Sequence, residues 1–243
     1  MSTTNKCVAE AIGAFALSFI GAGAICMTTK MGAAGPGLLG VAIAHGIILS
    51  IAVSATMNVS GGHVNPAVTC AMLVTGRISF VGAIQYIVSQ CVGAVLAGAL
   101  VLAIFKGMVT ADGKNVTFLA GLGTPSYDDS AAGMSMGHAI LIEAALTFLL
   151  VFAVFGTAVD PRAPKIGGFG IGLTICADIL LGGPLTGAAM NPSRTFGPGL
   201  VAFLSGNLPD FWKEQGVYWI GPILGAVLAA LIYDNMILDR KAA

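Results

Sequence analysis

Gly61-Gly62-His63-Val64-Asn65-Pro66-Ala67 is echoed later in the chain by Gly187-Ala188-Ala189-Met190-Asn191-Pro192-Ser193. Asn is a preferred helix N-cap, and Pro is favoured at the first helical position, where no backbone N–H is needed. Each stretch therefore predicts the start of a helix. Because both helix starts fall inside strongly apolar sequence, they determine what kind of fold the chain can adopt.

The composition around these stretches is typical of a membrane protein. Of the 243 residues, 56% are hydrophobic and 9% are charged, and the mean hydropathy is +0.91. Soluble domains carry about 25% charged residues. The formal net charge is zero, which gives no basic surface for nucleic acid. We therefore expect an all-α membrane protein that contacts the lipid bilayer and has no nucleic-acid partner.

The chain contains apolar stretches of two lengths. A hydrocarbon core of about 30 Å needs roughly 20 apolar residues per spanning helix. Six stretches predict spans: 8–27, 38–59, 80–105, 136–159, 166–181 and 217–237. Two others, 66–75 and 192–204, are too short to cross, and each begins at one of the Asn-Pro pairs. This pattern predicts six transmembrane helices plus two re-entrant half-helices.

The two halves of the sequence resemble each other. Glu10-Ala11-Ile12-Gly13-Ala14-Phe15 in the first span is echoed by Glu143-Ala144-Ala145-Leu146-Thr147-Phe148 in the fourth. With three spans per half, the second half must enter the membrane from the opposite face, which makes an inverted repeat. We expect one domain, 1–243, whose repeats cover roughly 1–107 and 134–243 and are joined by an extracellular loop, 108–133.

The basic residues indicate how the chain is oriented. The side of the two termini carries Lys6, Arg77, Arg162, Lys165, Arg240 and Lys241. Because cytoplasmic loops are enriched in Lys and Arg, both termini are expected in the cytoplasm. We expect a multi-pass protein of the cell membrane, plasma or inner.

The inverted arrangement would bring the N-termini of the two half-helices together near the midplane. Each N-terminus carries roughly half a positive charge. An Asn N-cap uses its side-chain oxygen on its own helix, which leaves its NH₂ group as a pure donor. Asn65 and Asn191 would then orient the oxygen of a water molecule and repel cations. These residues predict a pore for water and small neutral solutes that excludes protons and ions.

With these motifs the chain resembles the aquaporins of the major intrinsic protein family. The resemblance covers nearly the whole chain and rests on residues 60–69 and 191–198, on Glu10 and Glu143, and on Tyr218-Trp219-Ile220-Gly221-Pro222. It implies six spans, two half-helices, one pore per subunit and a homotetramer. The first signature is Asn-Pro-Ala, with Pro66 and Ala67, whereas the second departs from it, with Pro192 and Ser193. Ser is compatible with a helix start, so the second half-helix should survive.

The resemblance also implies a selectivity filter of His45, Ile179, Ala188 and Arg194. Arg194 lies at membrane depth, where an ionisable group is functional by default. The set is similar to that of plant tonoplast-type channels, whereas strict water channels carry a histidine in place of Ile179. The wider, less polar ring predicts that ammonia, urea and hydrogen peroxide pass as well as water. Thr195 stands where glycerol channels have Asp, so glycerol is disfavoured.

Other polar residues have structural and functional interpretations. Glu10 and Glu143 are expected to anchor the re-entrant loops by accepting backbone N–H groups, with a proton relay as the alternative. His63 holds its loop or faces the inner vestibule, or it acts as a pH gate. The ring of His45 could change charge near neutral pH. No two histidines share helical spacing, so the sequence predicts no metal site, and we expect no cofactor.

Two other classes of protein compete with a passive pore. An inverted-repeat secondary transporter of a small solute is the alternative, but its coupling-ion site would need carboxylates, and Asp178 is the one candidate. Arg194 would oppose cations there. A membrane enzyme is disfavoured, because the sequence supplies no nucleophile–base–acid set and no metal cluster.

Overall fold

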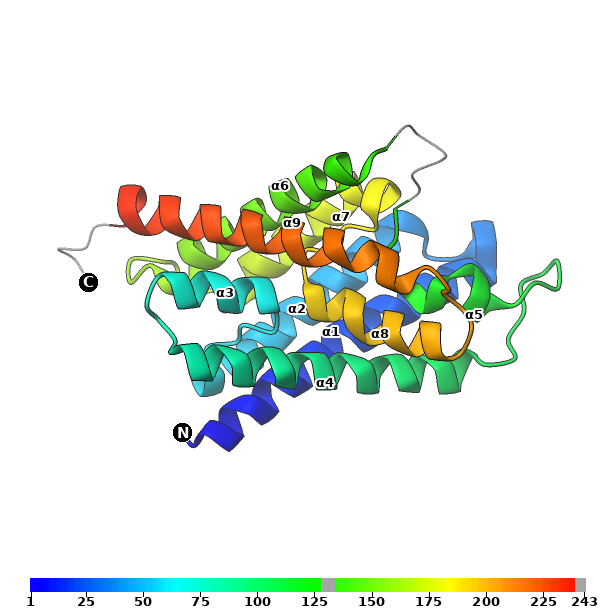
Figure 1. Ribbon diagram of the computed structural model, residues 1–243, viewed down its shortest axis with the longest axis horizontal. Helices are drawn as coiled ribbons and strands as arrows, with labels where there is room; N and C mark the ends of the chain where they lie inside the picture. Colours follow the sequence, from blue (N-terminus) through cyan, green and yellow to red (C-terminus); the bar gives the residue numbers. More distant parts are fainter. Residues whose placement is uncertain (128–133, 239–243) are drawn as a thin grey trace.

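The computed structural model describes residues 1–127 and 134–238. Within these residues, six helices are long and apolar enough to cross a membrane. They are α1 (Thr3–Met31), α2 (Gly37–Ser60), α4 (Phe80–Phe105), α6 (Met136–Val154), α7 (Phe169–Thr186) and α9 (Phe211–Ile232). Two shorter helices, α3 (Pro66–Val74) and α8 (Pro192–Leu204), lie end to end between the long ones (Figure 1). The predicted all-α fold of six spanning helices and two half-helices is confirmed.

Short helical segments extend or connect these elements. Single π-helical turns, η3 (Phe155–Val159) and η4 (Tyr233–Ile237), continue α6 and α9. A 3₁₀ turn, η1 (Gly32–Ala34), follows α1, and the segment between the two halves contains α5 (Val116–Leu119) and the 3₁₀ turn η2 (Gly121–Gly123). The last part of the predicted joining loop, 128–133, lies outside the described residues, as do Arg240 and Lys241.

The first and last spanning helices begin earlier than predicted, at Thr3 and Phe211, and the fifth departs from its predicted bounds of 166–181 at both ends. The fifth begins later, at Phe169, because Gly167 has a left-handed backbone with φ of 58° that interrupts a helix. It also continues through Pro184 to Thr186. Proline and glycine are tolerated in helices of membrane proteins, where neighbouring helices satisfy the freed backbone groups.

The order of elements in the first half, α1-α2-α3-α4, recurs in the second half as α6-α7-α8-α9. The two halves use the same close helix crossing. A Cβ atom at Gly93 of α4 would overlap the carbonyl of Ala11 on α1, and one at Gly225 of α9 would overlap the carbonyl of Ala144 on α6. Glycine therefore permits the same backbone approach twice, as expected for an inverted repeat.

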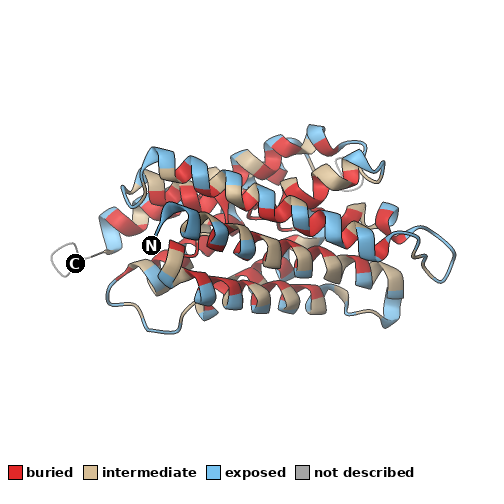
Figure 2. Cartoon of the chain, turned by 90° about the horizontal axis from the view of Figure 1, so that it is seen from below, coloured by how far each residue is buried: buried red, intermediate tan, exposed pale blue. Residues whose placement is uncertain are grey.

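The outer faces of the spanning helices are apolar. On α2, for example, Leu39, Ile43, Ile47 and Ile51 are exposed at every fourth position. Figure 2 shows exposed positions along the outside of the helices and buried positions facing inward. Glu10, Glu143 and Arg194 belong to the buried set. This inside-out distribution, with polar groups at the centre and aliphatic ones outside, suits a protein whose surrounding solvent is lipid.

Candidate functional site

Both half-helices begin at the Asn-Pro pairs. The side-chain oxygen of Asn65 accepts a hydrogen bond from the backbone N–H of Ala67 at 2.8 Å. The oxygen of Asn191 accepts from the backbone N–H groups of Ser193 at 3.1 Å and Arg194 at 3.3 Å. Each Asn has an extended backbone and is followed by Pro at the first helical position. Local sequence thus determines where each half-helix starts.

The two asparagines also reach across to the opposite loop. The amide nitrogen of Asn65 donates to the carbonyl of Met190 at 2.8 Å, and that of Asn191 donates to the carbonyl of Val64 at 3.0 Å. The sequence left the whole NH₂ group of each Asn facing the pore. The structure instead uses one N–H of each amide to hold the two N-termini together, and the second N–H remains available.

The loops before the asparagines have an unusual backbone. Val64 and Met190 are left-handed, with φ of 56° and 51°. This conformation is rare for residues with a Cβ, and for a β-branched residue it is an outlier. The carboxylate of Glu10 accepts the N–H of Val64 at 2.6 Å, and that of Glu143 accepts the N–H of Met190 at 2.7 Å. Each carboxylate also accepts the preceding N–H of its loop, from His63 at 2.9 Å and from Ala189 at 3.0 Å.

Four further side chains support the loops in a matched way. Ser60 and Thr186 each donate a hydroxyl to the nearby glutamate at 2.6 Å. Tyr86 and Tyr218 donate to the carbonyls of Ser60 and Thr186 at 2.7 and 2.8 Å. Ser60 and Tyr218 lie in the sequence motifs quoted above, but no local pattern predicts that these four side chains contact the loops.

One contact has no counterpart among the described residues of the second half. The amide nitrogen of Gln90 donates to Glu10 at 2.7 Å and to the hydroxyl of Thr69 at 3.0 Å. The same hydroxyl lies 3.1 Å from Nδ1 of His63. The single hydrogen of the Thr69 hydroxyl is donated to the carbonyl of Asn65 at 3.0 Å. In the contact between His63 and Thr69, His63 is therefore the donor, through Nδ1–H. His63 therefore holds its loop through both its backbone and its ring.

In the first turn of α8, directly after Asn191, the guanidinium of Arg194 contacts two acceptors. Its Nε and Nη2 atoms lie 3.4 and 3.3 Å from Nε2 of His45, and Nη2 donates to the carbonyl of Gly123 at 2.9 Å. Nδ1 of His45 donates to the carbonyl of Val41 at 2.8 Å, so Nε2 is left as the acceptor. Nη1 of Arg194 is buried and has no hydrogen-bond partner among the described protein atoms.

This geometry changes the expectation for His45. Both ring nitrogens are already engaged, one with a backbone carbonyl and the other with Arg194. A second proton would place an N–H⁺ group directly against the guanidinium, which repels it. The ring therefore acts as a neutral acceptor for Arg194, and a change of charge near neutral pH is disfavoured.

The other two predicted filter residues are buried apolar side chains. Ile179 and Ala188 are 3% and 4% exposed. Ile179 faces the same cavity as His45. Ala188, in the loop after α7, lies beside Gly182, which is one turn after Ile179 on α7. Asp178 lies on the helix face of Gly182, which packs toward Leu146 of α6. It is absent from the cavities described below.

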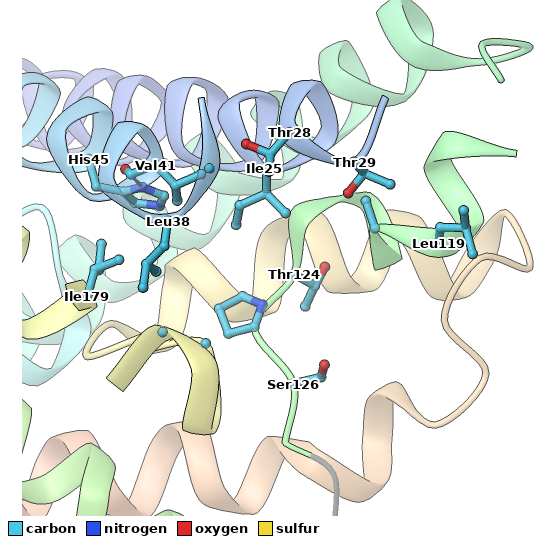
Figure 3. Close-up of a pocket in the computed structure, with 15 residues that line it drawn as sticks. Ile25, Thr28, Thr29, Leu38, Val41, His45, Leu119, Thr124, Ser126 and Ile179 are labelled. Carbon is cyan, nitrogen blue, oxygen red and sulfur yellow. Dashed lines mark hydrogen bonds between the residues drawn. The ribbon is translucent and has the colours of Figure 1, made fainter. Parts of the chain in front are cut away.

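Three cavities contain predicted site residues, whereas Arg194 and Ala188 are in the lining of none of the three. The first, which we name the Thr124 vestibule, has a volume of about 320 Å³, and Figure 3 shows His45 and Ile179 at one end of it and Thr124 and Ser126 along its side. The second is a constricted space of about 20 Å³ that contains both asparagines. The third, the His63 vestibule, has about 310 Å³ and is lined by His63, Met72 and Arg77. His63 lines both the second and the third cavity.

Ion pairs surround the far end of the His63 vestibule. Arg77 pairs with Asp234 at 2.7 Å and stacks over the ring of Phe155 at 5.2 Å. Nearby, Asp160 pairs with Arg162 at 2.6 Å. Hydrogen bonds from the Arg162 guanidinium and backbone hold the pKa of Asp160 well below its usual range. Through Arg77, these contacts tie the segments that extend α6 and α9 to the loop that follows α3.

Comparisons with known proteins agree with this architecture. A family model described as "Major intrinsic protein" matches residues 1–233. The protein named probable aquaporin TIP3-2, from Arabidopsis thaliana, is 42% identical over 243 residues, which cover 95% of this chain and 83% of that protein. Aquaporin TIP4-4 of Zea mays is 40% identical over 240 residues, covering 96% of this chain and 86% of its own.

Among solved structures, the aquaglyceroporin from Plasmodium falciparum has a similar fold. The TM-score is 0.83 over 97% of both chains, at 22% sequence identity. None of these similarities favours the secondary transporter that the sequence left as an alternative.

Proposed function

This chain belongs to the major intrinsic protein family of channels and is a passive water channel, and we propose that water crosses it in single file between Asn65 and Asn191. The crossed hydrogen bonds of the two asparagines are the observation that carries this proposal. Each amide has one N–H left, and both half-helices present their positive ends to the same narrow space. A water oxygen would accept from the two amides, its hydrogens would point along the pore, and cations would be repelled.

Arg194, with His45, Ile179 and Ala188, forms the proposed selectivity filter. Only Nη1 of the guanidinium lacks a partner among the described residues, so it is the donor that a passing solute would meet. The neighbouring Ile179 and Ala188 are apolar and supply no competing polar group. Such a ring favours neutral solutes that accept a hydrogen bond. We assign water, urea, ammonia and hydrogen peroxide to this class and expect glycerol to be excluded.

Glu10 and Glu143 are the proposed anchors of the two re-entrant loops, and His63 is a proposed support of the first. In this arrangement the repeats 1–107 and 134–243 act as one domain. Support comes from the paired backbone N–H contacts of each carboxylate.

The proposed assembly is a homotetramer in the cell membrane, with each subunit carrying its own pore. Its termini and the His63 vestibule would face the cytoplasm, and the Thr124 vestibule and the joining segment 108–133 would face outward. Support comes from the basic residues Lys6, Arg77 and Arg162 on the side of the N-terminus.

The solute range is tested by stopped-flow flux measurements on proteoliposomes. We expect fast flux of water, urea, ammonia and hydrogen peroxide, and glycerol flux at the level of empty vesicles. Ile179→His should narrow the ring and abolish urea flux while water flux persists. Ile179→Leu is the matched control, because it keeps an apolar side chain of the same volume and should keep urea flux. Wild-type water flux at the level of empty vesicles would contradict the channel, and background flux of all the other solutes would contradict the proposed range.

A further inference from the structure

The position of Arg194 depends on the segment that joins the two halves. Its Nη2 atom donates to the carbonyl of Gly123 at 2.9 Å, and Gly123 is the last residue of η2. This carbonyl and Nε2 of His45 are the acceptors of the guanidinium within the described chain. Whatever fixes the carbonyl of Gly123 therefore helps to fix the guanidinium.

The backbone that delivers this carbonyl is left-handed at three consecutive residues. The φ angles of Gly121, Leu122 and Gly123 are 51°, 55° and 70°. Glycine adopts this region readily, but a residue with a branched side chain such as leucine does so only when its surroundings require it. Strained residues of this kind cluster at functional sites. Leu122 is thus the residue of η2 whose backbone conformation is unfavourable for its own side chain.

Burial of the Leu122 side chain stabilises this left-handed backbone. The side chain is 0% exposed and packs in a cluster of buried side chains from α1, α4, α5 and α8. The cluster comprises Ala22, Cys26, Val101, Phe105, Val116 and Ala202. Burial of a whole leucine side chain is one of the larger apolar contributions that a single residue makes. It is available here only if the backbone accepts the left-handed conformation.

Both acceptors of Arg194 rest on one turn of α1. A Cβ atom at Gly123 would lie 2.5 Å from the carbonyl oxygen of Ala22, so the segment touches the α1 backbone there. A Cβ atom at Gly21 would overlap Nε2 of His45. Gly21 and Ala22 therefore serve as a common support, with His45 on one residue and Gly123 on the next.

We propose that Leu122 is a positioning residue for Arg194: its buried side chain locks the left-handed turn whose carbonyl holds the guanidinium across the pore. This proposal rests on the filter role of Arg194 proposed above. While the turn keeps its left-handed conformation, Arg194 keeps the selectivity filter narrow. When the turn loosens, the guanidinium loses its shortest hydrogen bond, and larger neutral solutes gain passage.

Leu122→Ala tests the proposal through a gain of function, which misfolding cannot produce. Glycerol flux relative to water flux is measured in proteoliposomes by stopped-flow light scattering. We expect this ratio to rise several-fold over wild type in Leu122→Ala. Phe118→Ala is the matched control, since Phe118 belongs to the same joining segment but is 59% exposed, and it should leave the ratio unchanged. Leu122→Met, which keeps the apolar volume, should also behave as wild type.

A double-mutant cycle shows whether Leu122 acts through Arg194. Arg194→Val should itself raise the ratio, and adding Leu122→Ala should raise it no further. An unchanged ratio in Arg194→Val would overturn the proposed filter. A raised ratio in Arg194→Val together with a wild-type ratio in Leu122→Ala would overturn only the role of Leu122. The role of Leu122 would also be overturned if Leu122→Ala raised the ratio equally in the wild type and in Arg194→Val. If Leu122→Ala does not fold, Gly123→Ala, whose added methyl presses on Ala22, takes its place with the same expected outcomes.

Discussion

The hydroxyl of Ser193 donates to the side-chain oxygen of Asn191 at 2.8 Å, an interaction that Ala67 of the first motif cannot make. The same oxygen still accepts the backbone N–H groups of Ser193 and Arg194. Serine at this position therefore adds to the helix cap. The departure from Asn-Pro-Ala leaves a half-helix of 13 residues that runs from Pro192 to Leu204, as the sequence predicted.

Ser193→Ala should remove this one buried hydrogen bond and keep the cap. We expect the free energy of unfolding in detergent to fall by about 1 kcal/mol. Water permeability should match wild type, because the amide nitrogen of Asn191 still donates to Val64. Thermal unfolding and stopped-flow shrinkage check the two parts. A large loss of water flux would show that the hydroxyl itself takes part in the pore.

At the level of elements, the re-entrant loops are held by carboxylates from the helices that they approach. Glu143 lies on α6 and accepts three hydrogen bonds, from Thr186, Ala189 and Met190. An isolated buried carboxylate would be costly, and these donors offset the cost. The left-handed backbone of Met190 is maintained by these contacts rather than by its own preference.

Glu143→Gln replaces one acceptor oxygen with a donor that cannot accept an N–H. At least one backbone N–H of the loop should then stay unpaired in the interior, at a cost of roughly 1–3 kcal/mol. We expect reduced thermal stability together with reduced water flux per protein. A variant that is as stable and as permeable as wild type would contradict the anchoring role.

Local sequence predicted the elements better than it predicted their contacts. The starts of α3 and α8 follow from Asn-Pro, because capping depends on residues next to each other in the chain. The hydrogen bond from Asn65 to Met190 joins residues 125 positions apart, and no local pattern specifies it. The same holds for the Gly123 carbonyl at Arg194, which falls in a segment that the sequence treated only as a connection. The end of α7 was predicted too early because membrane helices tolerate the Gly and Pro residues that end helices in water.

Across the whole molecule, the two halves share a skeleton but differ in detail. Each has a glutamate, a hydroxyl and a tyrosine that hold its re-entrant loop. Gln90 adds a bridge between Glu10 and Thr69 in the first half. By the offset of the two tyrosines, the residue at the corresponding place in the second half is Pro222, which has no side-chain donor. The hydroxyl of Thr195, which corresponds to Thr69, is buried and has no partner among the described residues. Both halves thus hold their re-entrant loops by the same contacts, whereas the hydrogen bonds of Thr69 and Thr195 differ between the two halves.

The central claim is that two opposed helix N-termini conduct water while their positive ends exclude protons. Osmotic water flux and proton flux, recorded on the same proteoliposomes at increasing protein content, test this claim most directly. Water permeability should rise with protein content, with a low activation energy, while proton permeability stays at the level of empty vesicles. Proton flux that rises in proportion to water flux, or water flux that never exceeds that of empty vesicles, would contradict the account.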